Sequence, residues 1–265
     1  MGCEFVQHVD APTHAVLQVE PRLDGDFRLV DERWQNEPGL PSLRYVDDFG
    51  NLCRRVTLPA GKSRLRYTAL AEVPDRLDPE ELSAPEVPPH ELPSSTLLFA
   101  LPSRYCPSDV LGDEAWERFG DVAPGWSRVQ AICDWVHGDI EFGYGTSSGT
   151  TTAADVLRDR KGVCRDFAHL AVTFCRSLNI PARYAFGYLP DIGVEPTGAA
   201  MDFCAWMEAY LGDRWWTFDP RNNRRRTGRV LIGRGRDAID VAMVTTYGPS
   251  LLVSMEVQAD QVDEA

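Results

Sequence analysis

The sequence predicts two structural parts joined by an extended connector. Short strand-like runs separated by Gly, Asp and Pro fill the first third of the chain and indicate a small antiparallel β domain over residues 1–73. Proline then crowds residues 74–95, which excludes a helix or a central strand there. Beyond this connector, apolar residues recur at helical spacing before a further series of strands. We therefore expect a second domain over residues 96–265 that contains both helices and strands.

The β domain is predicted from strand signals around short turns. Turn residues occur at 24–26 and again at 59–62. The segment Asp48-Phe49-Gly50-Asn51 lies between two strand-like runs, which is typical of a hairpin. The strands expected in this domain cover residues 15–19, 43–46, 52–58 and 65–70.

Three helices precede the strands of the second domain. Apolar residues over 126–140 recur every three or four positions and mark an amphipathic helix. The Thr-x-x-Asp pattern at 152–155 resembles a capping box and begins a shorter helix through residue 158. A third helix begins at Cys164, and Pro181 forces its end. The strands expected after it cover residues 182–189, 203–211, 214–219, 241–246 and 251–257.

Composition limits the class of protein and its partners. The 265 residues carry a formal net charge of -13, whereas nucleic-acid-binding proteins are usually basic. No run of about 18 apolar residues occurs, so no membrane span is expected, and the N-terminus lacks the pattern of a secretory signal. Seven cysteines without paired spacing are typical of reduced thiols. We therefore expect a cytoplasmic protein without nucleic-acid or membrane partners.

Cys164 is a candidate nucleophile because it lies in the first turn of a predicted helix. Unpaired backbone amides and the helix dipole stabilise an anion at this end, which favours a thiolate. Gly162 permits a close approach of the chain to the helix. A structural buried thiol is the alternative interpretation of a cysteine at this position.

The two strands around Gly212-Asp213 can be aligned from the sequence. A two-residue hairpin loop fixes their pairing, and counting back from it places Trp206 opposite Asp219. Side chains alternate between the two faces of a sheet, so Cys204, Trp206 and Asp219 share one face. Cys204 is then the diagonal neighbour of Asp219, at roughly 7–8 Å between Cα atoms.

Three short motifs in the second domain carry the pattern of a known family. They are Gly-Val-Cys-Arg-Asp-Phe-Ala-His-Leu at 162–170, Asp-Phe-Cys-Ala-Trp at 202–206 and Thr-Phe-Asp-Pro at 217–220. Together they resemble the core of the transglutaminase-like superfamily, which is similar in layout to papain-type cysteine proteases. In that family a nucleophilic Cys opens a helix, a His lies on one strand and an Asp on the next. The resemblance covers residues 97–257.

The resemblance implies an α+β, papain-like core in which the helix bearing Cys164 packs on an antiparallel sheet. The β domain ahead of it resembles the N-terminal domain of bacterial transglutaminase-like proteins. Cys164 and Asp219 match the cysteine and aspartate of the triad, whereas Cys204 occupies the histidine position. The family implies amide hydrolysis or transamidation of a peptide or protein, without a cofactor. A thiol is a poor general base near neutral pH, so we expect this activity to be impaired.

No other histidine is an evident replacement for the missing base. His169 follows Cys164 by five residues, which is about 140° around a helix, so it should point away from the thiol. His137 ends the predicted helix over 126–140 and is the first candidate if the base comes from elsewhere. His8, His14 and His90 lie in the β domain and the connector.

Further residues are candidates for binding near the thiol. The family layout suggests the Cys164 backbone amide as an oxyanion donor, with Tyr144 as the candidate second donor. Trp206 and Tyr188 are candidates for a substrate groove, and core packing is the alternative. Arginines cluster over residues 221–236, either as a solvated loop beside acidic neighbours or as a site for an anionic ligand.

Two alternatives to an impaired acyl transferase remain open. The first is a non-catalytic module that binds a peptide or a partner protein in the same cleft. The second is a metal- or redox-responsive thiol pair, in which Cys164, Cys204 and Asp219 act as ligands or the two cysteines form a disulfide. No dedicated zinc motif is present in the spacing of the cysteines, so the primary expectation is no metal.

Overall fold

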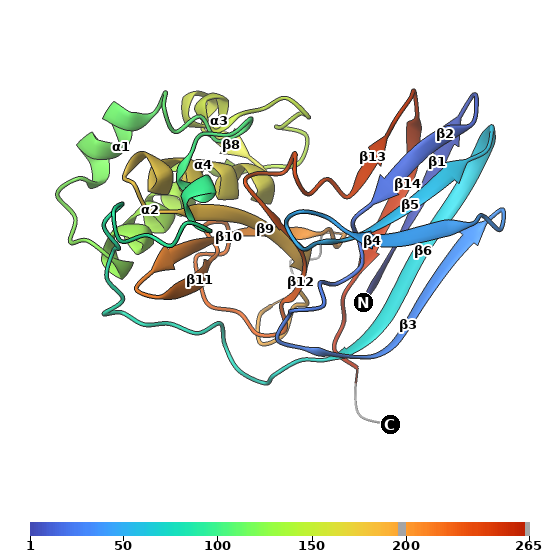
Figure 1. The fold of residues 1–265 in the computed structure, drawn as a ribbon, viewed down its shortest axis with the longest axis horizontal. Coiled ribbons are helices and arrows are strands. Elements are labelled where there is room, and N and C mark those ends of the chain that lie inside the picture. The colour runs from blue at the N-terminus through green and yellow to red at the C-terminus, as the bar shows by residue number, and fades with distance from the viewer. Residues whose placement is uncertain (196–199, 263–265) are drawn as a thin grey trace.

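The computed structural model describes residues 1–195 and 200–262 and shows a β-sandwich beside a sheet covered by helices (Figure 1). Residues 196–199 and 263–265, which fall within the predicted second domain, lie outside the described residues. The helices and the antiparallel sheets confirm the predicted α+β fold with a β-rich N-terminal region.

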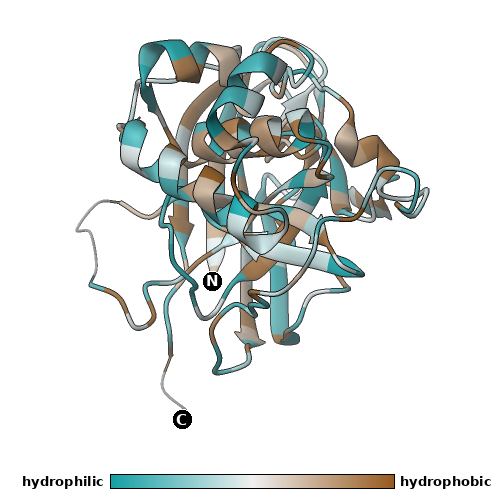
Figure 2. Cartoon of the chain, turned by 90° about the vertical axis from the view of Figure 1, so that its left-hand side faces the viewer, coloured by the Kyte–Doolittle hydropathy of each residue, from teal (hydrophilic) through white to brown (hydrophobic). Residues whose placement is uncertain are grey.

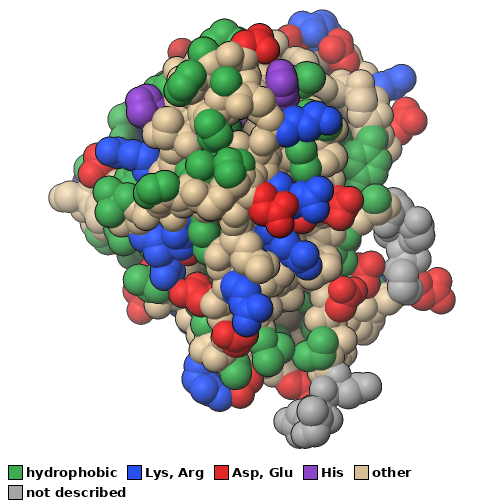
Figure 3. Space-filling view, turned by 90° about the vertical axis from the view of Figure 1, so that its right-hand side faces the viewer, with side chains coloured by type: hydrophobic (Ala, Val, Ile, Leu, Met, Phe, Trp, Pro, Cys, Tyr) green, Lys and Arg blue, Asp and Glu red, His purple; other side chains and the backbone are tan. Residues whose placement is uncertain are grey.

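The β-sandwich consists of two four-stranded antiparallel sheets, ordered β14-β1-β6-β3 and β13-β2-β5-β4. Alternate side chains of β1 are buried, as expected for a strand with one face against a core. On the side of the molecule shown in Figure 3, acidic and basic side chains are interspersed. The strands are β1 (Gly2–Val9), β2 (Thr13–Leu17), β3 (Arg28–Glu37), β4 (Ser42–Val46), β5 (Leu52–Leu58), β6 (Gly61–Glu72), β13 (Val244–Thr246) and β14 (Leu251–Gln258).

The C-terminal limit of the predicted second domain is wrong, because the chain returns to the sandwich. β13 pairs with β2, and β14 pairs with β1 so that Phe5 lies opposite Met255. The sequence predicted strands at both places, but it could not assign their partners because pairing between distant segments leaves no local pattern. The sandwich is therefore built from both ends of the chain. No strand was predicted from the sequence at β1 or β3.

The second domain has an antiparallel sheet of order β11-β10-β9-β12, covered on one face by helices (Figure 1). The helix α4 packs on β9 and β10, and the other helices pack on α4. The helices contain both apolar and hydrophilic residues (Figure 2). In an amphipathic helix the apolar residues recur every three or four positions and form one face. The elements are η1 (Leu97–Ala100), α1 (Gly112–Phe119), α2 (Trp126–Asp139), β7 (Glu141–Phe142), α3 (Ala153–Asp159), β8 (Lys161–Gly162), α4 (Cys164–Ser177), β9 (Ala182–Tyr188), β10 (Cys204–Leu211), β11 (Arg214–Phe218) and β12 (Val230–Gly235).

The hairpin of β10 and β11 has the register that the sequence predicted. Leu211 pairs with Arg214, and Met207 pairs with Phe218. Gly212 has a φ of 63°, a left-handed conformation that glycine adopts without strain. Asp219 follows the last residue of β11, so it lies near the start of β10, where Cys204 begins the strand.

The connector over residues 74–95 is extended, as predicted, and it is attached to the second domain. The carbonyl of Ala84 accepts a hydrogen bond from the Trp126 amide at 3.0 Å, and the carbonyl of Pro85 accepts one from the Gly212 amide at 2.8 Å. Glu86 forms an ion pair with Arg128 at 2.9 Å. The connector therefore covers the domain surface instead of acting as a free spacer.

One apolar cluster extends from the sandwich into the second domain. It contains Phe5 and Tyr67 of the sandwich together with Phe186, Tyr188 and Phe203 of the second domain. The Phe5 and Phe203 rings stack with centroids 6.3 Å apart. Burial of large aromatic side chains is a strong stabilising contribution, so the two domains fold as one packed unit.

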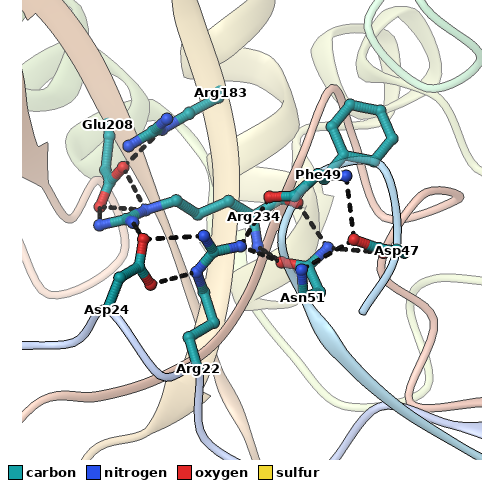
Figure 4. Close-up of polar contacts among 8 residues, drawn as sticks. All are labelled: Arg22, Asp24, Asp47, Phe49, Asn51, Arg183, Glu208 and Arg234. Carbon is teal, nitrogen blue, oxygen red and sulfur yellow. Dashed lines mark hydrogen bonds and ion pairs between the residues drawn. The ribbon is translucent and has the colours of Figure 1, made fainter. Parts of the chain in front are cut away.

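A polar network also links the domains (Figure 4). The buried Glu208 carboxylate pairs with Arg183 at 2.6 Å and with Arg234 at 2.8 Å. Arg234 also lies 3.4 Å from Asp24, which follows β2 of the sandwich. Asp24 in turn forms an ion pair with Arg22 at 2.7 Å. The network therefore connects β9, β10 and β12 to the segment after β2.

Asn51 closes the same network through the backbone of β12. Its Oδ1 accepts from the Arg234 amide at 2.9 Å and from Arg22 at 2.6 Å, and its Nδ2 donates to the Arg234 carbonyl at 2.9 Å. Arg22 also donates to the Phe49 carbonyl at 2.8 Å. The Asp48–Asn51 turn, predicted as a hairpin, thus also binds the second domain.

Replacing Glu208 by Gln should destabilise the protein by about 3–5 kcal/mol, because it leaves two arginines without their buried partner. Burial alone would raise the pKa of Glu208, but Arg183 and Arg234 outweigh it and lower the pKa. The stabilisation is therefore present above the unfolded pKa of about 4.3 and is lost as pH falls through the folded pKa. Urea unfolding at several pH values measures the difference in free energy of unfolding between the wild type and Glu208→Gln.

The matched control is Glu72→Gln, which removes the carboxylate of an exposed ion pair with Arg28. Such pairs contribute about 0–1 kcal/mol, so this variant should unfold close to the wild type. Two outcomes would contradict this explanation. One is an equal loss of stability in both variants, and the other is a destabilisation by Glu208→Gln that becomes larger below about pH 4.

Candidate active site

Cys164 begins α4, and its thiol lies beside the backbone of β10. The Sγ atom donates to the Phe203 carbonyl at 3.7 Å, and the Ala205 amide donates to the sulfur. A Cβ at Gly162 would lie 2.8 Å from the Cβ of Asp166, so the chain requires glycine where it enters the helix. This close approach is the one that the sequence predicted for Gly162.

The Val163 amide, immediately before α4, binds a carboxylate. Asp166 is buried, accepts from the Val163 amide at 2.9 Å and pairs with Arg165 at 2.9 Å. Burial raises the pKa of Cys164 to about 11; the Ala205 amide lowers it, and Asp202 and Asp219 raise it further. Burial and the nearby carboxylates thus oppose the thiolate that the helix N-terminus was expected to favour.

Asn222 lies between Cys204 and Asp219. Its Nδ2 is 2.8 Å from Asp219 Oδ2 and 4.0 Å from the Cys204 sulfur, and its amide donates to Asp219 Oδ1 at 2.9 Å. Burial raises the pKa of Cys204 well above its usual value, and Asp219 and Cys164 raise it further. The thiol at the histidine position is therefore protonated near neutral pH.

Arg229 holds the other side of the Asp219 carboxylate. It donates to Asp219 at 2.7 Å and to Asp78 of the connector at 2.8 Å, and its guanidinium lies 4.8 Å from the centroid of the Trp206 ring. Burial alone would raise the pKa of Asp219, but Arg229 and Asn222 outweigh it and lower the pKa. Asp219 is therefore ionised and neutralised by a fixed cation.

Both thiols, Cys164 and Cys204, line one cavity of about 640 Å³ between the domains. The second domain contributes aromatic residues such as Phe186 and Phe203 to its wall. The sandwich contributes Phe5 of β1 and further residues of β1, β13 and β14. No sequence pattern connected these residues with the site. Long-range strand pairing brings these residues there, and local sequence patterns carry no signal for it.

None of the five histidines lines this cavity, and all five lie in the described part of the chain. His169 is fully buried, and its Nε2 accepts from the Ala238 amide at 3.1 Å. Burial, followed by the charge of Arg165, lowers the pKa of His169 to about 3. The Nδ1 of His137 lies 2.9 Å from the Arg221 carbonyl and is engaged by it.

The other predicted binding residues divide into two groups. Tyr144 lines the cavity with 60% of its surface exposed, and burial followed by the charges of Asp202 and Cys164 raises its pKa. Trp206 and Tyr188 are buried and lie outside the cavity lining, so their assignment to a substrate groove is wrong. Trp206 packs under Arg229, and the Tyr188 hydroxyl donates to the Val19 carbonyl.

The structure gives no support to a metal at Cys164, Cys204 and Asp219. In residues 1–195 and 200–262, no group of three or more His, Cys, Asp or Glu side chains is placed to hold a metal ion. All seven cysteines are free thiols.

The arginine cluster over residues 221–236 mainly neutralises acidic neighbours. Arg225 pairs with Glu80, Arg226 with Asp191, and Arg236 with Asp240. Arg221 lines the cavity and stacks 4.5 Å from the centroid of the Phe142 ring. The pairing with acidic neighbours fits the first interpretation, but only Arg224 of these arginines is exposed, so the cluster is packed against the protein instead of being solvated.

Comparisons with known proteins agree with the fold. A family model described as the transglutaminase-like superfamily matches residues 117–220. A crystal structure from Cytophaga hutchinsonii, described as a candidate cysteine protease, is 31% identical, with a TM-score of 0.87 over 97% of this chain and 88% of that one. The chain therefore belongs to the transglutaminase-like superfamily.

Two mycobacterial proteins are also similar to this chain. An uncharacterized protein of Mycobacterium leprae is 28% identical over 85% of this chain and 82% of its own length. An uncharacterized protein of Mycobacterium tuberculosis is 28% identical over 62% of this chain and 55% of its own length.

In the described residues, every helix is too short or too polar to cross a membrane.

Cys164 should react with iodoacetamide about tenfold or more faster than Cys175. Both lie on α4, but Cys175 is fully buried in the helix–sheet core, and burial raises its pKa above that of Cys164. Timed labelling followed by peptide mass spectrometry gives the two rates. Labelling in urea is the control that both thiols are chemically competent, and earlier modification of Cys175 in the folded protein would contradict the assignment.

Proposed function

We propose that this chain is a transglutaminase-like protein of cysteine acyl-transfer ancestry that binds a peptide or protein amide beside Cys164 and turns it over slowly. The observation that carries the proposal is a cavity that holds the thiol but, among the described residues, no imidazole. The similar protein from Cytophaga hutchinsonii, described as a candidate cysteine protease, supports amide chemistry as the reaction of the ancestral site.

The residues fit distinct roles in such a reaction. Cys164 is the nucleophile that would attack the amide carbonyl and form a thioester with release of an amine. The Cys164 backbone amide and Tyr144, at the cavity wall, are candidate donors to the oxyanion. Hydrolysis or transamidation would follow when water or an amine attacks the thioester.

Proton transfer is the step for which the site lacks a suitable group. The Cys164 proton must leave before attack, and the leaving amine must receive a proton. Cys204 matches the histidine position of the family triad, but burial and the Asp219 carboxylate hold its proton. Asp219 is the triad carboxylate, and Arg229 and Asn222 already occupy it.

A non-catalytic binding role is the second candidate, and the cavity favours it. Its volume of about 640 Å³ lies within the range of ordinary ligand sites, and it retains apolar walls although the acid–base partner is absent. Under this interpretation, the chain would retain the substrate-binding half of the ancestral site.

Replacing Cys204 by His should raise the rate of acylation by about 10²–10⁴-fold, or about 3–5 kcal/mol of barrier. An imidazole there could accept the Cys164 proton and be oriented by Asn222 or Asp219. The larger ring replaces a thiol and can reduce the gain by overpacking. Single-turnover acylation with an activated ester and a glutamine-mimic amide measures the rate.

Cys164→Ala in the Cys204→His background is the matched control and should abolish acylation. Rapid turnover by the wild type, together with a slower Cys204→His variant, would contradict the proposal. In that case the base must come from elsewhere, and His137→Ala is the first variant to measure because His137 lies against the Arg221 backbone at the cavity.

A further inference from the structure

We infer that the cavity binds an extended apolar segment of a polypeptide and that the β-sandwich forms one wall of this site. The inference rests on the proposed function and deepens it by naming the kind of substrate or ligand segment. It concerns a part of the chain that the family motifs do not include.

An apolar wall begins next to the candidate nucleophile. The Phe203 carbonyl accepts from the Cys164 thiol, and the Phe203 ring stacks on Phe5 of β1 with centroids 6.3 Å apart. Phe186 packs edge-on against Phe203 at 6.0 Å. Leu252 of β14 also lines the cavity. A bound chain that reaches Cys164 therefore runs along apolar residues of both domains.

The sandwich side of the cavity favours a polypeptide over a plain hydrocarbon chain. β13 and β14 both border the cavity, and each is the terminal strand of its sheet in the described part of the chain. Terminal strands present unpaired backbone groups that can pair with an extended peptide. Gln7 and Ser250, which hydrogen-bond to each other at 2.8 Å, add polar groups to the same wall.

The position of β14 at the cavity is set by its pairing with β1. Its register with β1 places Leu252 opposite Gln7 and Leu251 opposite His8, with a bulge between Val6 and Gln7. Both leucines are exposed, but Leu252 lines the cavity and Leu251 lies outside the lining. The two leucines therefore form a natural pair of test and control positions.

The test uses alkylation of Cys164, which proceeds through the thiolate and needs no acid–base partner. The thiolate population is the same for every reagent, so the ratio of rates between two reagents reports on their binding. The reagents are iodoacetyl-Leu-Val-amide, iodoacetyl-Gly-Gly-amide and N-hexyl iodoacetamide, with peptide mass spectrometry to assign the label. In the wild type the Leu-Val reagent should modify Cys164 about tenfold or more faster than the Gly-Gly reagent, since its side chains enter the apolar cavity.

Leu252→Asp should remove this preference, and Leu251→Asp should retain it. Thermal unfolding of both variants checks that they are folded. Equal rates for the two peptide reagents in the wild type, or equal loss in both variants, would overturn the inference. A faster reaction with N-hexyl iodoacetamide than with the Leu-Val reagent would overturn it in favour of an aliphatic-chain site.

The labelling test of the peptide site can succeed or fail separately from the activity test of the proposed reaction. If Cys204→His gains no acyl-transfer activity but the Leu-Val preference is present, the proposed reaction fails and the binding site stands. If activity appears without the preference, the reaction stands and the peptide wall fails.

Discussion

The packing of Phe5 on Phe203 within one apolar cluster connects the sandwich to the second domain, and the rest of the site depends on it. Phe203 directly precedes Cys204, and its carbonyl contacts the Cys164 thiol. Movement of the sandwich would therefore displace both the cavity wall and the backbone beside the thiol. The buried Glu208 network also connects the two domains, through charged groups (Figure 4).

The electrostatics at the site are consistent with a triad that has lost its central member. In a working triad the carboxylate orients an imidazole, and the imidazole exchanges a proton with the nucleophile. Here Asp219 is neutralised by Arg229, and Asn222 separates it from Cys204. The site remains electrically satisfied without a histidine, while burial keeps the Cys164 thiol protonated. Because the buried carboxylate is compensated by a cation and an amide, it does not require a histidine beside it for stability.

Local sequence patterns predicted most of the elements and the register of the β10–β11 hairpin. Helical periodicity located α2 and α4, and the Gly212-Asp213 turn aligned the two strands. The return of β13 and β14 to the sandwich was not predictable, because pairing between distant segments has no local signature. The same limit hid the sandwich wall of the cavity and the role of Asn222. It also hid the surroundings of Cys164, which raise its pKa against the expected effect of the helix N-terminus.

The most direct test of the account is a pH titration of the Cys164 thiolate, followed by its ultraviolet absorbance as a difference between the wild type and Cys164→Ala. The account predicts a pKa of about 11, so the difference signal should show no step between about pH 5 and pH 9. A step with its midpoint near neutral pH would show an activated thiolate and would contradict the conclusion that this site lacks its proton-transfer partner.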